Sequence, residues 1–105
     1  SGTLSQCNTP AHCARQTWSS SSPETDFASM AAYVKEMPRT EVVEQTNHYI
    51  HAEASSALFG FVDDLELLLD VSNGSIQARS VSRLGDSDLG VNANRLRELQ
   101  SLVSH

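Results

Sequence analysis

The sequence feature that most constrains the fold is an Asn-Gly pair inside a stretch of alternating polar and apolar residues. The stretch runs from Phe61 to Arg83 and reads FVDDLELLLDVSNGSIQARSVSR. An Asn-Gly pair in this setting is a strong short-range signal for a β-hairpin. We expect a two-residue type I′ turn at Asn73-Gly74, which sets the register so that Leu65 faces Ser82.

The predicted hairpin has an apolar face and a charged face, because successive side chains of a strand point to opposite sides. The apolar face, which we expect to lie in the core, consists of Phe61, Leu65, Leu67, Leu69, Val71, Ile76 and Ala78. On the charged face, the register places Asp64 directly opposite Arg83. Glu66 lies diagonal to Arg79 on the same face.

Helices and further strands are predicted on both sides of the hairpin. Apolar residues at helical spacing, preceded by Ser22 as an N-cap, predict a helix that ends at Pro38. Strands are expected over residues 40–46 and 49–55. A last helix is expected to begin with Asn92 as its N-cap.

These elements predict a two-layer α+β sandwich, in which a four-stranded antiparallel sheet carries two helices on one face. The sandwich is expected to be a single domain over residues 23–105, since a chain of this length can bury one core. Residues 1–22 lack periodicity and are expected to form an extended arm that Trp18 anchors to the domain.

Cys7 and Cys13 are the two cysteines, and they stand close together in the run CNTPAHC. Their spacing favours a disulfide that closes a small loop, worth about 2 kcal/mol in the chain-entropy model. The alternatives are two free thiols or a metal site with His12, but such a metal site usually needs a second ligand pair. A disulfide implies an oxidising compartment. We therefore expect an extracytoplasmic location, with the cytoplasm as the alternative.

The charge of the chain argues against several classes of partner. Its formal net charge is −6, from 13 acidic and 7 basic residues. Because no basic stripe is present, nucleic acid and anionic membrane surfaces are not expected to bind. No apolar run approaches about 18 residues, so no membrane span is expected. No phosphate-binding loop or dinucleotide fingerprint occurs, and no cofactor is expected.

Alternation along the strands places six charged side chains on the outer face of the sheet: His51, Glu53, Asp64, Glu66, Arg79 and Arg83. Such a set could form a carboxylate–histidine metal site or an arginine-lined pocket for an acidic group. The alternative is an ion-pair ladder in water, in which each exposed pair contributes roughly 0–1 kcal/mol. We assign these residues as candidates for ligand or partner binding, and we assign no metal.

A second set is expected to have a structural role: Asp63, Ser80, Ser82, Asp88, Asn92 and Arg95. Asp63 falls on the core side of the hairpin, where a carboxylate needs a partner. Arg95 or the backbone amides of the glycine-containing turn at 85–90 could supply that partner and tie the last helix to the sheet. The alternative is a catalytic acid in a cleft.

Four segments of the chain are distinctive: the Cys-x5-Cys run, YIHAE at 49–53, FVDDLE at 61–66 and RSVSRLGDSDLGVN at 79–92, which Arg95 follows. Together they resemble an uncharacterised bacterial and plastid family called domain of unknown function 1499. The chain departs from the family pattern at Asp86, where an aromatic is usual, and around Cys13. The resemblance implies an exported or membrane-associated setting, and it implies no activity.

No nucleophile, base and orienting residue can be recognised as a catalytic set, and the Gly-x-Ser-x-Gly motif is absent. We therefore expect a non-enzymatic binding or assembly module. It would contact an unknown protein or a small acidic ligand through the polar face of the sheet. The alternative is a small metal-assisted, hydrolase-like enzyme that uses His51, Glu53, Asp63 and Asp64.

Overall fold

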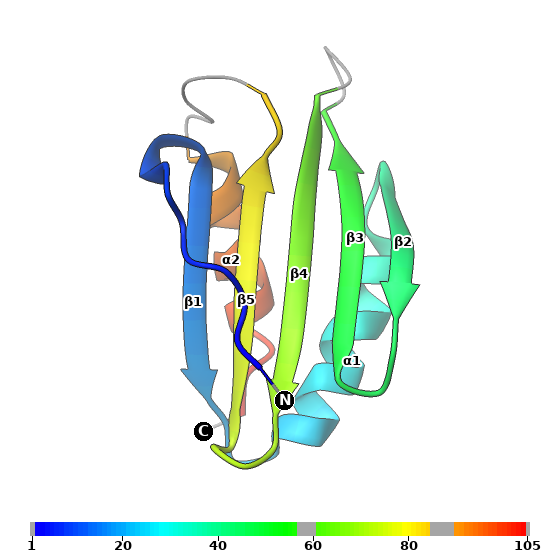
Figure 1. The fold of residues 1–105 in the computed structure, drawn as a ribbon. Helices are drawn as coiled ribbons and strands as arrows, with labels where there is room; N and C mark the ends of the chain where they lie inside the picture. Colours follow the sequence, from blue (N-terminus) through cyan, green and yellow to red (C-terminus); the bar gives the residue numbers. More distant parts are fainter. Residues whose placement is uncertain (1, 57–60, 85–89, 105) are drawn as a thin grey trace.

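The computed structural model describes residues 2–56, 61–84 and 90–104. Its elements are a 3-10 turn η1 (Pro10–His12), β1 (Cys13–Ser19), α1 (Pro23–Glu36), β2 (Thr40–Gln45), β3 (Tyr49–Ser55), β4 (Val62–Asp70), β5 (Ser75–Ser82) and α2 (Val91–Gln100). The strands form one antiparallel sheet in the order β1-β5-β4-β3-β2. Both helices lie on the same side of this sheet, as Figure 1 shows. The predicted α+β class with two helices on one face is confirmed.

The sheet has five strands, so the prediction of four was wrong. The missing strand is β1, which lies within the stretch predicted as an extended arm and pairs with β5 along its whole length. Its sequence, CARQTWS, shows no alternation of polar and apolar residues that would mark a strand. Pairing with the open edge of β5 determines its conformation. Trp18 lies on this strand and is 5% exposed, so it anchors the segment in the core as expected.

The register of the central hairpin differs from the predicted one by two residues. Leu65 faces Ser80 and not Ser82, because a four-residue turn over 71–74 replaces the expected two-residue turn. The Gly74 amide donates to the Val71 carbonyl at 3.2 Å, and Asp70 Oδ1 accepts from the Asn73 amide at 3.3 Å. Gly74 has a positive φ of 60°. A shift of two residues leaves every side chain on its predicted face.

The core lies between the sheet and the two helices. Met30 and Val34 of α1, with Leu96 and Leu99 of α2, pack against the inner face of the sheet. The inner face contributes Ile50, Ala52, Leu65, Leu67, Leu69, Ile76 and Ala78. Phe61 and Val71 were also expected in the core, but each is 48% exposed. Neither belongs to a strand: each stands at an end of β4, outside the paired part of the sheet.

The predicted start of the first helix is confirmed, and the predicted N-cap of the last helix is wrong. The first helix begins at Pro23 with Ser22 at its N-cap position, as expected, although the Ser22 side chain makes no capping hydrogen bond. The second helix begins at Val91, and the cap position is Gly90 with a φ of 85°. Asn92 is therefore not the N-cap but a buried residue of the first turn. No helix among the described residues has the length and apolar character needed to cross a bilayer.

Candidate functional site

The outer face of the sheet has two halves with different surroundings. In Figure 1 the N-terminal segment before β1 crosses the face over β1 and β5, on the side opposite the helices. On the other half, over β2, β3 and β4, five carboxylates lie together, which we call the acidic patch: Glu41, Glu44, Glu53, Asp64 and Glu66; Asp70 lies on the same face at the turn end of β4. Among the described residues, no helix or strand covers this half.

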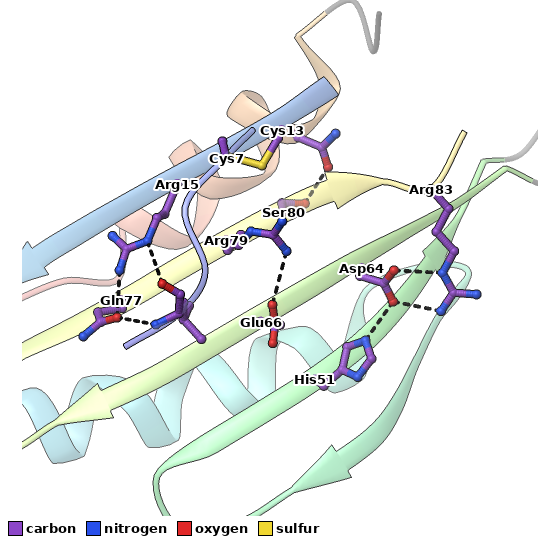
Figure 2. Close-up of polar contacts among 12 residues, drawn as sticks. Cys7, Cys13, Arg15, His51, Asp64, Glu66, Gln77, Arg79, Ser80 and Arg83 are labelled. Carbon is purple, nitrogen blue, oxygen red and sulfur yellow. Dashed lines mark hydrogen bonds and ion pairs between the residues drawn. A yellow bond between two sulfur atoms is a disulfide. The ribbon is translucent and has the colours of Figure 1, made fainter. Parts of the chain in front are cut away.

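Arg83 and His51 bind to the centre of the acidic patch. The guanidinium of Arg83 donates to both carboxylate oxygens of Asp64, at 2.8 and 2.9 Å. Its Nη2 also donates to Glu53 Oε2 at 2.7 Å. His51 Nε2 lies 2.8 Å from Asp64 Oδ1. Figure 2 shows His51, Asp64 and Arg83 converging from β3, β4 and the end of β5.

A second group lies next to the first along β4. Arg79 Nη1 is 3.5 Å from Glu66 Oε1, and the two residues are directly opposite in the sheet. The Tyr49 hydroxyl donates to the other Glu66 oxygen at 2.5 Å. The Nε of Arg79 is buried and has no hydrogen-bond partner among the described residues. Among the described residues, Arg79 forms one ion pair, with Glu66.

The acidic patch contains a pair of like charges at directly opposite positions as well as ion pairs. Glu41 of β2 lies directly opposite Glu53 of β3, and Glu44 lies opposite His51. Like charges at directly opposite positions destabilise a sheet. Glu41 and Glu44 are exposed and form no ion pair among the described residues. The patch thus has five carboxylates against two arginines and leaves negative charge on its β2 side.

Hydrogen bonds and burial change the pKa of two groups in the site. Hydrogen bonding to Arg83 lowers the pKa of Asp64, since the guanidinium stabilises the carboxylate. His51 adds to this effect, whereas partial burial opposes it. Burial raises the pKa of the Tyr49 hydroxyl, and the hydrogen bond to Glu66 raises it further. Tyr49 is therefore a neutral donor in the site.

The lowered pKa of Asp64 predicts a pH-dependent contribution to stability. The contribution is present above the pKa of Asp64 in the unfolded chain, about 3.9, and is lost as the pH falls through its lower pKa in the folded protein. We expect Asp64→Asn to cost about 1 kcal/mol of unfolding free energy at pH 6 and clearly less at pH 3. Urea unfolding of both proteins at the two pH values measures this. A cost that did not change with pH would contradict the ion pair.

The structural residues meet on the other side of the sheet in a buried polar network. Arg95 Nη1 donates to Asp63 Oδ2 at 2.9 Å, and it also reaches Ser80 Oγ and Asn92 Oδ1 at 3.1 and 3.0 Å. The Asn92 amide donates to Ser82 Oγ and to the His12 carbonyl, at 2.9 and 3.1 Å. Because the network joins α2 to β4, β5 and the residue before β1, it locks three parts of the fold together. Of the two partners predicted for Asp63, Arg95 is the one that the structure shows. Asp88 and most of the 85–90 turn, which includes the other predicted partner, lie outside the described residues.

All six predicted ligand candidates lie on the outer face, and four of them form one connected group: His51, Glu53, Asp64 and Arg83. Ligand atoms of three of these side chains, His51, Glu53 and Asp64, lie within 4.8 Å of one another, so they could hold a divalent cation. Asp63 does not join them, because it faces the helices. Sequence reasoning missed Tyr49 as a donor, and it missed Glu41 and Glu44, which share one face only because a register shift between Val42 and Glu44 interrupts the alternation of β2.

Cys7 and Cys13 form a disulfide, with 5.6 Å between their Cα atoms. The bond joins the N-terminal segment to the start of β1, beside the polar network and on the half of the face that the segment crosses (Figure 2). The alternatives of free thiols and of a metal site with His12 are excluded, because both sulfur atoms are used in the bond.

The fold and the site define the class of protein: a small disulfide-bonded α+β domain with an open, charged sheet face. The family model described as "Protein of unknown function (DUF1499)" matches residues 3–103. The chain belongs to this family. The comparison with curated proteins found no match, and the comparison with solved structures found none.

Proposed function

We propose that the protein is a non-enzymatic binding module and that its acidic patch takes a partner presenting basic side chains. The observation that carries the proposal is the charge imbalance of the open half of the sheet. Five carboxylates share that surface with two arginines, and Glu41, directly opposite Glu53, forms no ion pair among the described residues. A basic partner would relieve this repulsion and would find the surface uncovered by any described element.

A small acidic ligand fits the surface less well than a basic partner. The two arginines that could recognise an acid are already engaged, Arg83 by Asp64 and Glu53 and Arg79 by Glu66. An acidic ligand would have to displace these carboxylates and would lie among others. Complementary charge across an interface favours partner choice and association rate, and here it favours a basic partner.

The metal-assisted enzyme is the weaker candidate for a geometric reason. Its four residues do not form one site, since Asp63 binds Arg95 on the helix side of the sheet. Two of the three that remain, Glu53 and Asp64, are bridged by Arg83, whose guanidinium lies between them where a cation would bind. A divalent ion would therefore have to displace an arginine from two carboxylates.

We further propose an extracytoplasmic compartment for the protein. The Cys7–Cys13 disulfide supports this, because such bonds persist in oxidising compartments and are rare in the cytosol.

The proposed function is tested with a fluorescein-labelled hexalysine peptide, followed by anisotropy at low ionic strength. We expect Glu41→Gln with Glu44→Gln to weaken binding about tenfold, because two exposed charges of the acidic patch are removed. Added salt should weaken binding to the unmodified protein, since exposed charges are screened. Neither glutamate takes part in an ion pair among the described residues, so the fold should survive the change.

The matched control removes two charges from the opposite side of the molecule. Glu24 and Glu36 are exposed residues of α1, and Glu24→Gln with Glu36→Gln changes the net charge by the same amount. This variant should bind hexalysine within twofold of the unmodified protein. Equal weakening by the two double variants would reduce the effect to net charge and overturn the proposal. Equal binding of a hexaglutamate peptide would also overturn it.

A further inference from the structure

The N-terminal segment lies on the outer face as an extended peptide would lie in a binding groove. Both main-chain groups of Leu4 are bound by side chains of the sheet. Its amide donates to Gln77 Oε1 at 2.8 Å, and its carbonyl accepts from Arg15 Nε at 3.4 Å. The Leu4 side chain is 6% exposed, as a residue in a specificity pocket would be. We call Gln77 and Arg15 the clamp.

The clamp is itself held in place. Arg15 Nη2 donates to Gln77 Oε1 at 2.8 Å, and Arg15 Nη1 donates to Thr17 Oγ1 at 3.1 Å. Gln77 is 6% exposed, although its strand faces outward at this position. The Thr3 hydroxyl donates to Gln77 Oε1 at 2.9 Å and accepts from Arg15 Nη2 at 3.1 Å. Three donors thus converge on Gln77 Oε1. Two of them, the Thr3 hydroxyl and the Leu4 amide, belong to the N-terminal segment, and the third is Arg15 Nη2.

The outer face has further room beside the start of the N-terminal segment. A hollow of about 520 Å³ lies beside Gly2, and its walls include Leu68 and His48. These residues extend the outer face toward the turn between β4 and β5. A longer extended segment would therefore find room along the same line.

The disulfide determines how tightly the segment is tethered to the clamp. Leu4 stands three positions before Cys7, which is bonded to β1 through Cys13, and nine positions before Cys13 itself. The effective concentration of a tethered group falls roughly as the −3/2 power of tether length. Lengthening the tether threefold should therefore lower the local concentration of Leu4 at the clamp about fivefold.

We propose that the N-terminal segment is a disulfide-locked strap on a site for extended peptides. The site reads the main chain through Gln77 and Arg15 and takes an apolar side chain where Leu4 now lies. A dithiol reductant unlocks it: the Cys7–Cys13 S–S bond breaks, each sulfur takes one electron and one proton to become a thiol, and the reductant closes its own disulfide. This site lies next to the acidic patch, since Arg15 is directly opposite Arg79, but it uses none of the five carboxylates and recognises a different chemistry.

Hydrogen exchange at single amides tests the lock. In the full chain, reduction should speed exchange of the Leu4 amide about fivefold and leave the β5 amides of Ile76 and Ala78 unchanged. The double variant Cys7→Ser with Cys13→Ser should behave like the reduced protein. Unchanged exchange at Leu4 would overturn the lock. Faster exchange at Leu4 together with Ile76 and Ala78 would also overturn it, because the whole sheet would then be opening.

Peptide binding tests the clamp. The probe is a fluorescein-labelled peptide with the sequence of residues 2–6, GTLSQ, and its control has aspartate in place of leucine. The probe should bind the reduced protein about fivefold more tightly than the oxidised protein, and the control should bind neither. Gln77→Leu should abolish binding by removing the acceptor, and Gln77→Glu, which keeps an oxygen there, should retain it. Equal binding to both redox forms overturns the lock, and binding to neither form overturns the clamp.

The two proposals fail independently of each other. Glu41→Gln with Glu44→Gln leaves every clamp contact in place, so it should not change the peptide binding measured here. Reduction leaves the five carboxylates of the acidic patch in place, so hexalysine binding should persist. A result against one proposal is therefore not a result against the other.

Discussion

Replacing Arg95 with methionine should destabilise the protein by about 3–5 kcal/mol, because it leaves the carboxylate of Asp63 buried without its partner. The side chains of Asp63 and Arg95 are 12% and 14% exposed, and their atoms are 2.9 Å apart. The same change removes donors to Ser80 and Asn92. A loss of this size is a large part of the roughly 5–15 kcal/mol that stabilises a domain of this length. Urea unfolding followed by the fluorescence of Trp18, the single tryptophan, measures it.

Two further variants separate the ion pair from other effects of the substitution. Arg97→Met on the same helix should cost less than about 0.5 kcal/mol, since Arg97 is exposed and bonds only to Asn94 among the described residues. The double variant Asp63→Leu with Arg95→Met should be more stable than Arg95→Met alone, because no unpaired charge remains in the core. A cost for Arg95→Met as small as that of Arg97→Met would show that the network does not hold α2 to the sheet.

The sequence predicted the parts of this fold in which local pattern and tertiary structure agree. Alternation along β3 and β4 predicted which side chains face the core and which face outward, since the period of a strand is two residues. The charged pairs on the outer face followed from the same rule. An error of two residues in the hairpin register did not move any of them to the other face. It did change which residues lie directly opposite each other: Asp64 faces Val81 and reaches Arg83 from a diagonal position, and Glu66 faces Arg79 directly.

The features that sequence reasoning missed depend on contacts between distant residues. No local pattern marks β1, whose seven residues become a strand only by pairing with β5. Leu4 and Gln77 are separated by 73 positions, and nothing near either residue predicts that one binds the other. Asn92 looked like a helix cap because caps are defined locally. Its buried side chain instead joins Ser80, Ser82 and the His12 carbonyl.

Asp26, in the first turn of α1, provides the second large effect. The carboxylate is 3% exposed and accepts from Ser20 Oγ at 2.5 Å. It also accepts from the amide and the hydroxyl of Ser104, at 2.7 and 2.8 Å. One side chain thus joins the start of α1 to the connection after β1 and to the C-terminal segment. Val103, the residue before Ser104, is buried in the core.

We expect Asp26→Ala to cost about 3 kcal/mol, since hydrogen bonds to a charged group contribute roughly 1.5–3 kcal/mol each and the three are not additive. Ser104→Ala removes one of these donors and should cost about 1.5 kcal/mol. Glu24→Ala is the control, because Glu24 also lies in the first turn of α1 but is exposed; it should cost about 0.5 kcal/mol through the helix dipole. Urea unfolding gives the three values. Faster hydrogen exchange at the Ser104 amide in Asp26→Ala, relative to Glu24→Ala, would show that the C-terminal segment separates first. If Asp26→Ala and Glu24→Ala had the same cost, Asp26 would act only through the helix dipole and the junction would contribute nothing.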